Sequence, residues 1–399
     1  MNVLYLSYDG ALDPLGRSQV IPYLEALSRR GHRFDLITFE KEERWKKEEE
    51  RQELQARLEN EDIHWYPLPY HRRPSALATA YDLFQAYRRA LSLWPRRRWA
   101  LIHSRSYPCT LVARWLRKRL GIPYLFDMRG FYPEERVDGG LWARNGFLFR
   151  LAKKREEAFL REAAGVVTLT EASLPALREL MARVGSRALL RVIPTSVDLK
   201  QFAPSEDGSR GRSLAYIGSL GTWYLLEEML ALGREALEEI PDLNLLFLVN
   251  DEERRLVRIF EGSPLPRAQF EVRSVSHEEV PKALSGVAAT FFLIAPAPSK
   301  LASAPTKFAE SLALGLPVVV NRGVGDSATV VDEEEVGVVV EELTPRGYRE
   351  AARRLRDRLR EPGIGERCRR VAQDRYDLEK AAEAYAGLYR QILEGVTSA

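Results

Sequence analysis

Short apolar runs alternate with longer amphipathic segments along most of the 399-residue chain. Short runs bounded by turn residues are typical of buried strands, and apolar positions that repeat every three to four residues are typical of helices. In the first half this pattern predicts strands at 2–7, 33–39, 63–67, 100–104, 124–127, 166–169 and 191–194. The helices predicted between them lie at 18–30, 45–59, 76–93, 108–120, 149–163 and 173–183.

A polar, glycine-containing run at 204–212 interrupts this series, and a second one follows it. Its predicted strands are 213–218, 244–249, 269–272, 288–294, 317–321 and 337–340. Its predicted helices are 224–239, 251–261, 277–284, one that ends at Gly315, and those within 345–393. Strand–helix alternation predicts an α/β protein with parallel, doubly wound sheets.

Two such series predict two Rossmann-like domains that face a central cleft. We expect a first domain at 1–192, a linker at 193–204 and a second domain at 205–375. The remaining residues, 376–399, are expected to form a helix that could cross back to the first domain.

Bulk composition indicates a folded, soluble protein, with 45% hydrophobic and 29% charged residues. Cys109 and Cys368 lie far apart in the sequence, which argues against a disulfide scaffold and fits a reducing cytoplasm. No basic region precedes the apolar run at 3–6, so no signal peptide is expected. No apolar stretch reaches 18 residues, so any membrane contact should be peripheral.

Positive charge is concentrated between residues 88 and 161, which hold 18 Lys or Arg and 6 Asp or Glu, with four tryptophans among them. Such a stretch can form solvated helix faces, contact an anionic membrane surface or bind nucleic acid. Nucleic acid is the least favoured partner, because no recognised nucleic-acid-binding motif is present. The sequence therefore leaves open a peripheral location on the inner face of a membrane.

The segment 303–317 carries the strongest chemical signal. It predicts a loop, a helix that begins at Pro305-Thr306, and a stop at Gly315. Backbone N–H groups at Thr306 and Lys307 can hold an anion, and the Lys307 side chain adds a full positive charge. Glu310, one turn on, could bind a pair of sugar hydroxyls. Phosphate and ribose contacts so close together suggest a nucleotide, although an ordinary amphipathic helix would show a similar pattern.

Three further loops could contribute to binding. Gly16 precedes a helix that Ser18 could cap. Gly218 and Ser219 follow the first strand of the second series and offer backbone N–H groups. The run 323–328, with Gly323 and Gly325, imitates a dinucleotide fingerprint, but no clear helix and acid-ended strand follow it, so we prefer a glycine-rich loop beside a phosphate.

A group of polar residues at strand ends in the first half could serve an acceptor. Asp127, Arg129 and Glu134 follow one strand, and His103 and Arg105 end another. Such residues could contact a polyol, or they could form a structural ion pair and a hydrogen-bonded histidine. No Asp-x-Asp pair, Walker A loop, zinc-protease motif, nucleophile elbow or Cys-x-x-Cys is present, so no metal is expected.

Four segments together resemble family four retaining glycosyltransferases of the GT-B fold: the first loop and helix at 15–32, the linker at 192–202, the loop at 216–224 and the donor motif at 305–319. The resemblance covers nearly the whole chain. It implies transfer of a sugar from a nucleotide diphosphate sugar, which is a co-substrate rather than a cofactor, with retention and without metal.

The resemblance also implies roles for the candidate residues. Glu310 would hold the ribose, and the other donor-side residues would surround the diphosphate and sugar: Gly16, Gly218, Ser219, Thr306, Lys307, Gly323 and Gly325. Ala302 stands where the family often has a second glutamate, so either Ser303 or Lys300 takes part of that role or the donor sugar is bound differently. The 216–224 loop lacks the family's basic pair, which leaves Lys307, Lys300 and Arg322 to neutralise phosphate.

We therefore predict a cytoplasmic hexosyltransferase-type enzyme in polysaccharide biosynthesis, acting on a saccharide or lipid-linked acceptor. Lys307, Arg129 and Asp127 are the predicted catalytic residues, and His103, Arg105 and Glu134 the predicted acceptor side. A nucleotide-sugar epimerase of the same architecture and a non-catalytic saccharide-binding protein remain alternatives.

Overall fold

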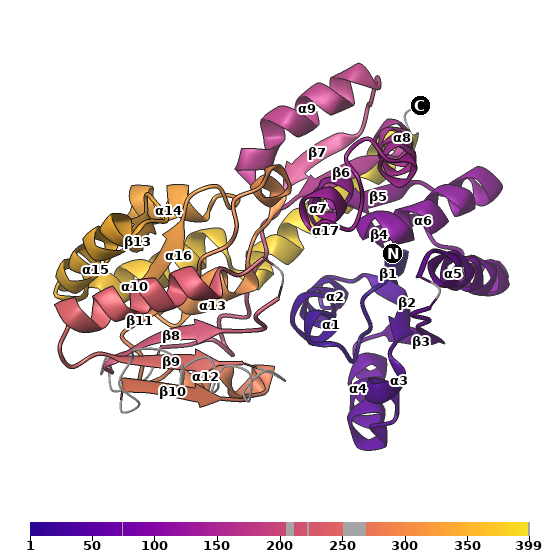
Figure 1. The fold of residues 1–399 in the computed structure, drawn as a ribbon. Helices are drawn as coiled ribbons and strands as arrows, with labels where there is room; N and C mark the ends of the chain where they lie inside the picture. The colour runs from indigo at the N-terminus through magenta and orange to yellow at the C-terminus, as the bar shows by residue number, and fades with distance from the viewer. Residues whose placement is uncertain (74, 205–210, 222, 250–268, 398–399) are drawn as a thin grey trace. The chain divides into compact units, whose positions relative to one another are not determined.

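The chain divides into two compact units in a computed structural model, which describes residues 1–73, 75–204, 211–221, 223–249 and 269–397. Unit 1 comprises Met1–Pro194 and Leu378–Ala399, and unit 2 comprises Thr195–Asp377. Each unit is an α/β assembly with one parallel sheet (Figure 1). Within the described residues, no helix has both the length and the apolarity needed to cross a membrane.

The sheet of unit 1 has seven parallel strands in the order β3-β2-β1-β4-β5-β6-β7. In chain order they are β1 (Asn2–Ser7), β2 (Arg33–Glu40), β3 (Ile63–Pro69), β4 (Leu101–Arg105), β5 (Tyr124–Asp127), β6 (Gly165–Thr168) and β7 (Leu189–Val192). β1 pairs in register with β2 on one side and β4 on the other, for example Tyr5 with Leu36 and His103. The five inner strands are almost wholly buried because helices cover both faces, as a parallel sheet requires, whereas the edge strands β3 and β7 are partly exposed.

The helices of unit 1 form two layers around two hydrophobic cores. One core joins the sheet to α2 (Ile21–Ser28), α4 (Glu48–Asn60) and the last helix, α17 (Leu378–Thr397). The other joins it to α5 (Ser75–Arg97), α6 (Ser106–Leu120), α8 (Phe147–Glu162) and α9 (Leu174–Arg183). Shorter helices complete the unit: α1 (Pro14–Gln19), α3 (Glu42–Trp45), η1 (Glu171–Ser173) and α7 (Tyr132–Asp138). The chain's last helix is thus part of the core of its first unit.

The sheet of unit 2 has six parallel strands in the order β10-β9-β8-β11-β12-β13. They are β8 (Ser213–Ile217), β9 (Asn244–Leu248), β10 (Phe270–Arg273), β11 (Ala289–Phe291), β12 (Val318–Asn321) and β13 (Gly337–Val340). The described helices are α10 (Leu226–Glu239), η3 (His277–Glu279), α12 (Val280–Ala283), η4 (Pro298–Ala302), α13 (Thr306–Ala313), α14 (Ser327–Glu334), α15 (Pro345–Leu359) and α16 (Ile364–Arg375). One continuous core fills this unit.

Each sheet has a point at which the strand order reverses. In unit 1 the reversal lies between β1 and β4, and in unit 2 between β8 and β11. Loops that leave the carboxyl ends of two such strands diverge to opposite faces, and the space they leave is the usual ligand site of doubly wound sheets. The segments after β1, β4, β8 and β11 are therefore the ones that position a site.

The structure corrects several predicted elements. The helix predicted at 18–30 begins earlier, as α1 at Pro14, and Ser18 is not its cap, because the Ser18 hydroxyl donates to the Pro14 carbonyl within the helix. The helix predicted at 45–59 is divided into α3 and α4. The run 323–328 does lead into a helix, α14, which sequence analysis missed because α14 has only eight residues. The helix predicted at 251–261 lies outside the described residues.

Gly16 sits inside α1 rather than in a loop before a helix. A Cβ atom added there would lie 1.9 Å from the carbonyl oxygen of Gly10. The requirement for glycine at this position therefore comes from close packing of α1 on the chain's own backbone.

We predict that Gly16→Ala lowers the free energy of unfolding by several kcal/mol, since backbone must move to admit the methyl group. Urea unfolding of the intact protein measures this change. Gly387→Ala is the matched control, because Gly387 lies in α17 and its Cβ would meet no atom within 4 Å. The control should gain up to about 1 kcal/mol from helix propensity. Equal stability of the two variants would contradict the packing explanation.

Candidate active site

Lys307 is the central cation of the predicted site in unit 2. It is the second residue of α13, which begins at Thr306 after the N-cap Pro305, in agreement with the predicted helix start at Pro305-Thr306. Its Nζ atom lies 3.9 Å from the ring centre of Tyr224 and 4.2 Å from that of Tyr216. The side chain is about nine-tenths buried, and Nζ has no hydrogen-bond partner among the described residues. Burial lowers the pKa of Lys307 to about 7, although the aromatic faces attract its charged form.

Gly218 brings the loop after β8 up to this ammonium group. Its φ is +109°, and a Cβ atom there would lie 3.1 Å from Lys307 Nζ. The next carbonyl, that of Ser219, accepts a 2.6 Å hydrogen bond from the Tyr216 hydroxyl. The start of α13 and the loop after β8 thus meet at the reversal between β8 and β11. Thr222, in the same loop, lies outside the described residues.

Glu310 lies one turn after Lys307 and is 4% exposed. Its Oε1 atom is 2.8 Å from Nε2 of His277, which lies in η3, directly after β10. Burial disfavours the charged imidazole, but the Glu310 carboxylate outweighs it and raises the pKa of His277. Sequence analysis missed His277, since nothing in its spacing links a residue at 277 to one at 310. The capping box formed by Ser276 and Glu279 was the available sign of an ordered turn there.

Lys300, Ser303 and Gly325 lie together in a second group of the unit. The Lys300 carbonyl accepts hydrogen bonds from the backbone N–H of Ser303 at 3.1 Å and of Gly325 at 2.8 Å. The Lys300 ammonium lies 3.8 Å from the ring centre of Trp223. These contacts join η4 to the glycine loop after β12, where Gly323 has a φ of +85°.

Arg322 forms its ion pairs away from both the Lys307 group and the Lys300 group. Its guanidinium pairs with Glu341 at 2.5 Å and with Asp332 at 2.8 Å, on exposed surface. The helix, strand and acidic residue that a dinucleotide fingerprint requires do follow the 323–328 run, as α14, β13 and Glu341. The Glu341 carboxylate is already paired with Arg322, however.

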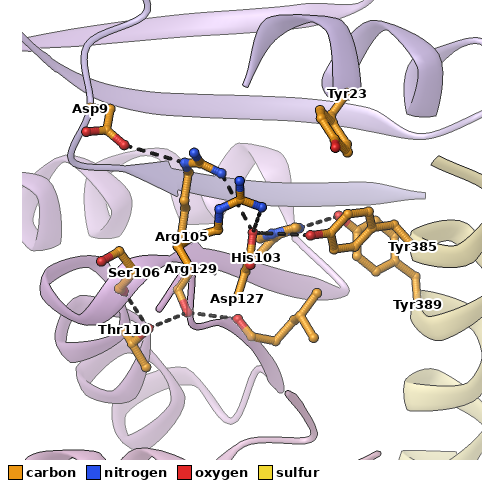
Figure 2. Close-up of polar contacts among 12 residues, drawn as sticks. Asp9, Tyr23, His103, Arg105, Ser106, Thr110, Asp127, Arg129, Tyr385 and Tyr389 are labelled. Atoms are coloured by element: carbon orange, nitrogen blue, oxygen red, sulfur yellow. Dashed lines mark hydrogen bonds and ion pairs between the residues drawn. The ribbon is translucent and has the colours of Figure 1, made fainter. Parts of the chain in front are cut away.

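In unit 1 the predicted acceptor-side residues form a buried network with the last helix (Figure 2). The Tyr389 hydroxyl lies 2.5 Å from Nδ1 of His103, and the Tyr385 hydroxyl donates to Oδ2 of Asp127 at 3.3 Å. Nε2 of His103 is 3.5 Å from the same Asp127 oxygen. Both ring nitrogens of His103 therefore have partners, and burial lowers its pKa. Tyr385 and Tyr389, 258 to 286 residues away from these partners, were missed by sequence analysis.

Two arginines border this network at the ends of β4 and β5. Arg105 Nη1 and Arg129 Nη1 each lie 3.9 Å from Asp127 Oδ2, and Arg105 Nε lies 3.5 Å from Asp9. Burial would raise the pKa of Asp127, but Arg129, His103 and Arg105 outweigh it and lower that pKa. Because Asp127 is 1% exposed, its carboxylate is suited to holding the two arginine side chains in place. Arg129 and Ser106 have positive φ values of 60° and 67°, a strained backbone that places both turns at the sheet's edge.

Glu134 belongs to a separate cluster. It lies in α7 and is 2.9 Å from Lys153 of α8, which also pairs with the fully buried Glu156. Tyr107, at the start of α6, donates to Glu156 at 2.5 Å. The Glu134 carboxylate thus helps to join α7 to α8. Among the described residues no group of three or more His, Cys, Asp or Glu could hold a metal ion.

Residues 19–195 match the family model of the glycosyl transferase 4-like domain. The match covers most of unit 1 and less than half of the chain. The fold of the chain is GT-B, and the predicted resemblance to glycosyltransferases and the predicted enzyme class are confirmed.

Solved structures share the fold over nearly all of the chain. Sucrose-phosphate synthase from Thermosynechococcus elongatus is 17% identical, covers 99% of this chain and 100% of its own, and has a TM-score of 0.73. Anabaena HepE in complex with UDP is 14% identical, with full coverage of both chains and a TM-score of 0.67. Starch synthase IV from Arabidopsis thaliana, bound to ADP and acarbose, is 11% identical over 99% of each chain, with a TM-score of 0.64. No curated protein matches the sequence.

We predict that Lys307→Met stabilises this glycosyltransferase while impairing its site. The folded state lowers the pKa of Lys307 to about 7, so the unfolded chain binds the proton more tightly between that pH and the lysine's ordinary pKa. Keeping a buried ammonium therefore costs stability at neutral pH, and methionine removes that cost. Thermal melting at pH 7 should show a Tm raised by a few degrees.

The same cost should fall as pH rises above 7, because the wild-type lysine then becomes neutral. The difference in Tm between Lys307→Met and the wild type should thus be larger at pH 6.5 than at pH 9. A lower Tm for the variant at both pH values would show that the ammonium stabilises the fold.

Proposed function

We propose that the enzyme transfers a sugar from a nucleotide diphosphate sugar to a saccharide or lipid-linked saccharide, with retention and without metal. One observation carries the proposal: a buried ammonium, Lys307 Nζ, has no hydrogen-bond partner among the described residues. It lies beside the first turn of α13, where the N–H groups of Thr306 and Lys307 have no acceptor within the helix. A pyrophosphate placed there would supply both the missing charge and the missing acceptors.

Seven of the predicted donor-side residues have a role in this proposal. Lys307 stabilises the charge that develops on the leaving diphosphate, where a preorganised donor contributes a few kcal/mol to the barrier. Glu310, oriented by His277, accepts from the ribose hydroxyls. Gly218 and Ser219 supply backbone at the phosphates, and the group of Lys300, Ser303 and Gly325 borders the donor sugar.

A metal ion is not needed for this chemistry, because Lys307 and helix N–H groups already oppose the diphosphate charge. Retention is consistent with a leaving phosphate that takes the acceptor's proton on the face from which the sugar departs. On the acceptor side, Arg105 and Arg129 would contact the acceptor, and Asp127 would act as a positioning residue for them.

The nature of the donor is supported by relatives of the same fold. Anabaena HepE has been solved with UDP, with UDP and glucose, and with UDP-glucose. We propose a nucleotide diphosphate sugar here too and leave its base and sugar open. We further propose a role in polysaccharide biosynthesis in the cytoplasm, at the inner face of a membrane.

Kinetics of two variants test the donor site. Lys307→Met should lower kcat by about 100-fold or more, the scale of one lost transition-state donor. Glu310→Gln should chiefly raise KM for the donor, since its contact is with a part of the donor that does not react. Lys200→Met, an exposed lysine in unit 2, is the matched control. Unchanged donor kinetics in both site variants would remove the assignment.

Donor affinity should also depend on pH. Lys307 must be charged to hold the diphosphate, and its pKa in the free enzyme is about 7. The Kd for a nucleotide diphosphate sugar should therefore rise as pH rises from 7 to 8.5, with a limiting slope of tenfold per unit for one proton. Titration calorimetry measures this slope. Lys307→Met should lose it, and any remainder should disappear with His277→Gln.

Incubation with donor alone distinguishes the proposed transferase from the alternative of an epimerase. An epimerase would convert the donor to an isomer without an acceptor, whereas the proposed transferase would return it unchanged or slowly hydrolysed. A saccharide-binding protein would show no thermal shift with any nucleotide.

A further inference from the structure

One segment of unit 1 combines positive charge with exposed apolar side chains. Residues 139–155 contain five Lys or Arg and no Asp or Glu. Leu141, Phe147, Leu148 and Leu151 are 66%, 71%, 48% and 38% exposed. Large apolar side chains so close together are costly to leave in water, at about 25 cal/mol for each Å².

Three of these apolar side chains, Phe147, Leu148 and Leu151, lie at the start of α8. Phe147 and Leu151 are four residues apart, and Lys154 and Arg155, both exposed, follow Leu151 by three and four. Such spacing aligns them along one face of a helix, with apolar residues first and cations after them. Lys153 points the other way, into its pairs with Glu134 and Glu156.

The start of α8 extends beyond the sheet. Glu156 contacts Tyr107 at the beginning of α6, which follows the carboxyl end of β4. Phe147 is nine residues earlier on α8, a rise of about 14 Å along the helix. The apolar end of α8 therefore projects past the carboxyl edge of the sheet, the edge that carries Arg105 and Arg129.

A second apolar stripe lies on α5. Leu77, Tyr81 and Phe84 are 71%, 50% and 50% exposed and occupy positions i, i+4 and i+7 of the helix. Arg88 continues the same stripe and is exposed. Asp82, the acid within α5, is buried and pairs with His71 instead of facing solvent. The outer face of α5 is thus also apolar and then basic.

The two stripes lie on the same side of the sheet. α5 packs against α6, and α6 packs against α8 (Figure 1). All three helices run from the carboxyl edge of the sheet towards its amino edge, because each connects parallel strands or leads into one. The first turns of α5 and of α8 are therefore both at the carboxyl edge.

We propose that these two helix starts, with the 141–146 turn between α7 and α8, dock unit 1 on a bilayer that contains anionic lipid. Apolar side chains would enter the interface, and the neighbouring cations would meet lipid phosphates. Membrane binding by this surface does not depend on the proposed function. Its consequence for the enzyme does rest on that function: a lipid-linked acceptor would be presented at the edge that carries Arg105 and Arg129.

The docking surface consists of Leu77, Tyr81, Phe84, Arg88, Leu141, Arg144, Phe147, Leu148, Arg150, Leu151, Lys154 and Arg155. It uses only part of the basic stretch 88–161 that the sequence suggested, adds the apolar residues of α5, and leaves out three of the four tryptophans of that stretch. Trp99 is buried and bonds Asp35, and Trp94 and Trp115 pack on Trp99 and Tyr87. The cations at 96–98 and 117–119 lie in or just after the last turns of α5 and α6, at the amino edge.

A membrane fits this surface better than a nucleic acid does. Phosphates of either kind would attract the cations. The leucines have no counterpart on a nucleic acid, because single-stranded binding uses aromatic faces and duplex binding uses polar contacts. A bilayer accepts both kinds of side chain at once.

Vesicle sedimentation tests the proposal on the full chain, without donor. The wild type should bind vesicles of phosphatidylcholine mixed with phosphatidylglycerol, bind pure phosphatidylcholine much more weakly, and lose affinity with salt. Phe147→Ser/Leu151→Ser should lower the partition coefficient by about tenfold or more, since two exposed apolar groups are lost. Arg150→Ala/Lys154→Ala should lower it by a similar factor on anionic vesicles only.

Arg360→Ala/Arg370→Ala is the charge-matched control, because it removes two exposed cations from unit 2. It should bind anionic vesicles like the wild type. Quenching by brominated lipid adds a depth measurement: Trp142, half-buried beside Leu141, should be quenched, and Trp142→Phe should lose that part of the signal.

No binding of the wild type to anionic vesicles would overturn the proposal, as would equal loss in the control. Binding to nucleic acid in place of vesicles would also overturn it. Titration of a nucleotide sugar into each variant keeps the two proposals separate: normal donor affinity with lost vesicle binding supports this surface, and normal vesicle binding with no donor affinity refutes the transferase alone.

Discussion

The burial of the Lys307 ammonium is the constraint around which the site of unit 2 is arranged. A protonated lysine inside a protein needs either an anion or a set of polar acceptors. Around Lys307 Nζ the described residues provide aromatic faces and the charge of the nearby Glu310, but no hydrogen-bond acceptor. Those faces offset only part of the desolvation cost, as the lowered pKa shows. The protonated Lys307 side chain therefore lacks a hydrogen-bonded anion in the described structure, and a bound anion would stabilise it.

Topology explains why this charge lies where a nucleotide could reach it. β8 and β11 are neighbours in the sheet, but their connections leave toward different strands, β9 and β12. Gly218 and the start of α13 consequently face the same gap, and glycine is favoured at 218 because its φ is +109°, a conformation that other residues rarely adopt. Unit 1 repeats the arrangement at β1 and β4, where Asp9 meets Arg105.

Much of the fold could be predicted, because strand and helix periods are local properties of the sequence. The boundaries of α13 followed from a proline start and a glycine stop, and both parallel sheets followed from alternation. Short elements such as α3 and α14 were missed, since a helix of two turns has too few residues to show a period. Gly16 was given a ligand role because a sequence does not reveal that its Cβ would strike Gly10.

The site could be predicted only where its residues are close in sequence. Lys307 and Glu310 share one helix, and their chemistry could be read together. His277, Tyr385 and Tyr389 act through contacts that span 33 to 286 residues, and no local pattern encodes such a contact. The exposed side chains of α5 and α8 posed the same difficulty. Their charge could be read from the sequence, but the faces of these two helices that remain in water are known only from how both pack against α6.

The role of α17 follows from the same distant contacts. The Tyr385 hydroxyl bonds to Asp127 at the end of β5, and the Tyr389 hydroxyl bonds to His103 within the adjacent strand β4. Asp127 in turn holds Arg105 and Arg129. Hydroxyls are suited to this task because they satisfy a buried carboxylate and imidazole without adding charge. The arginines at the carboxyl edge of unit 1 therefore depend for their placement on α17, a helix that follows the whole of unit 2 in the sequence.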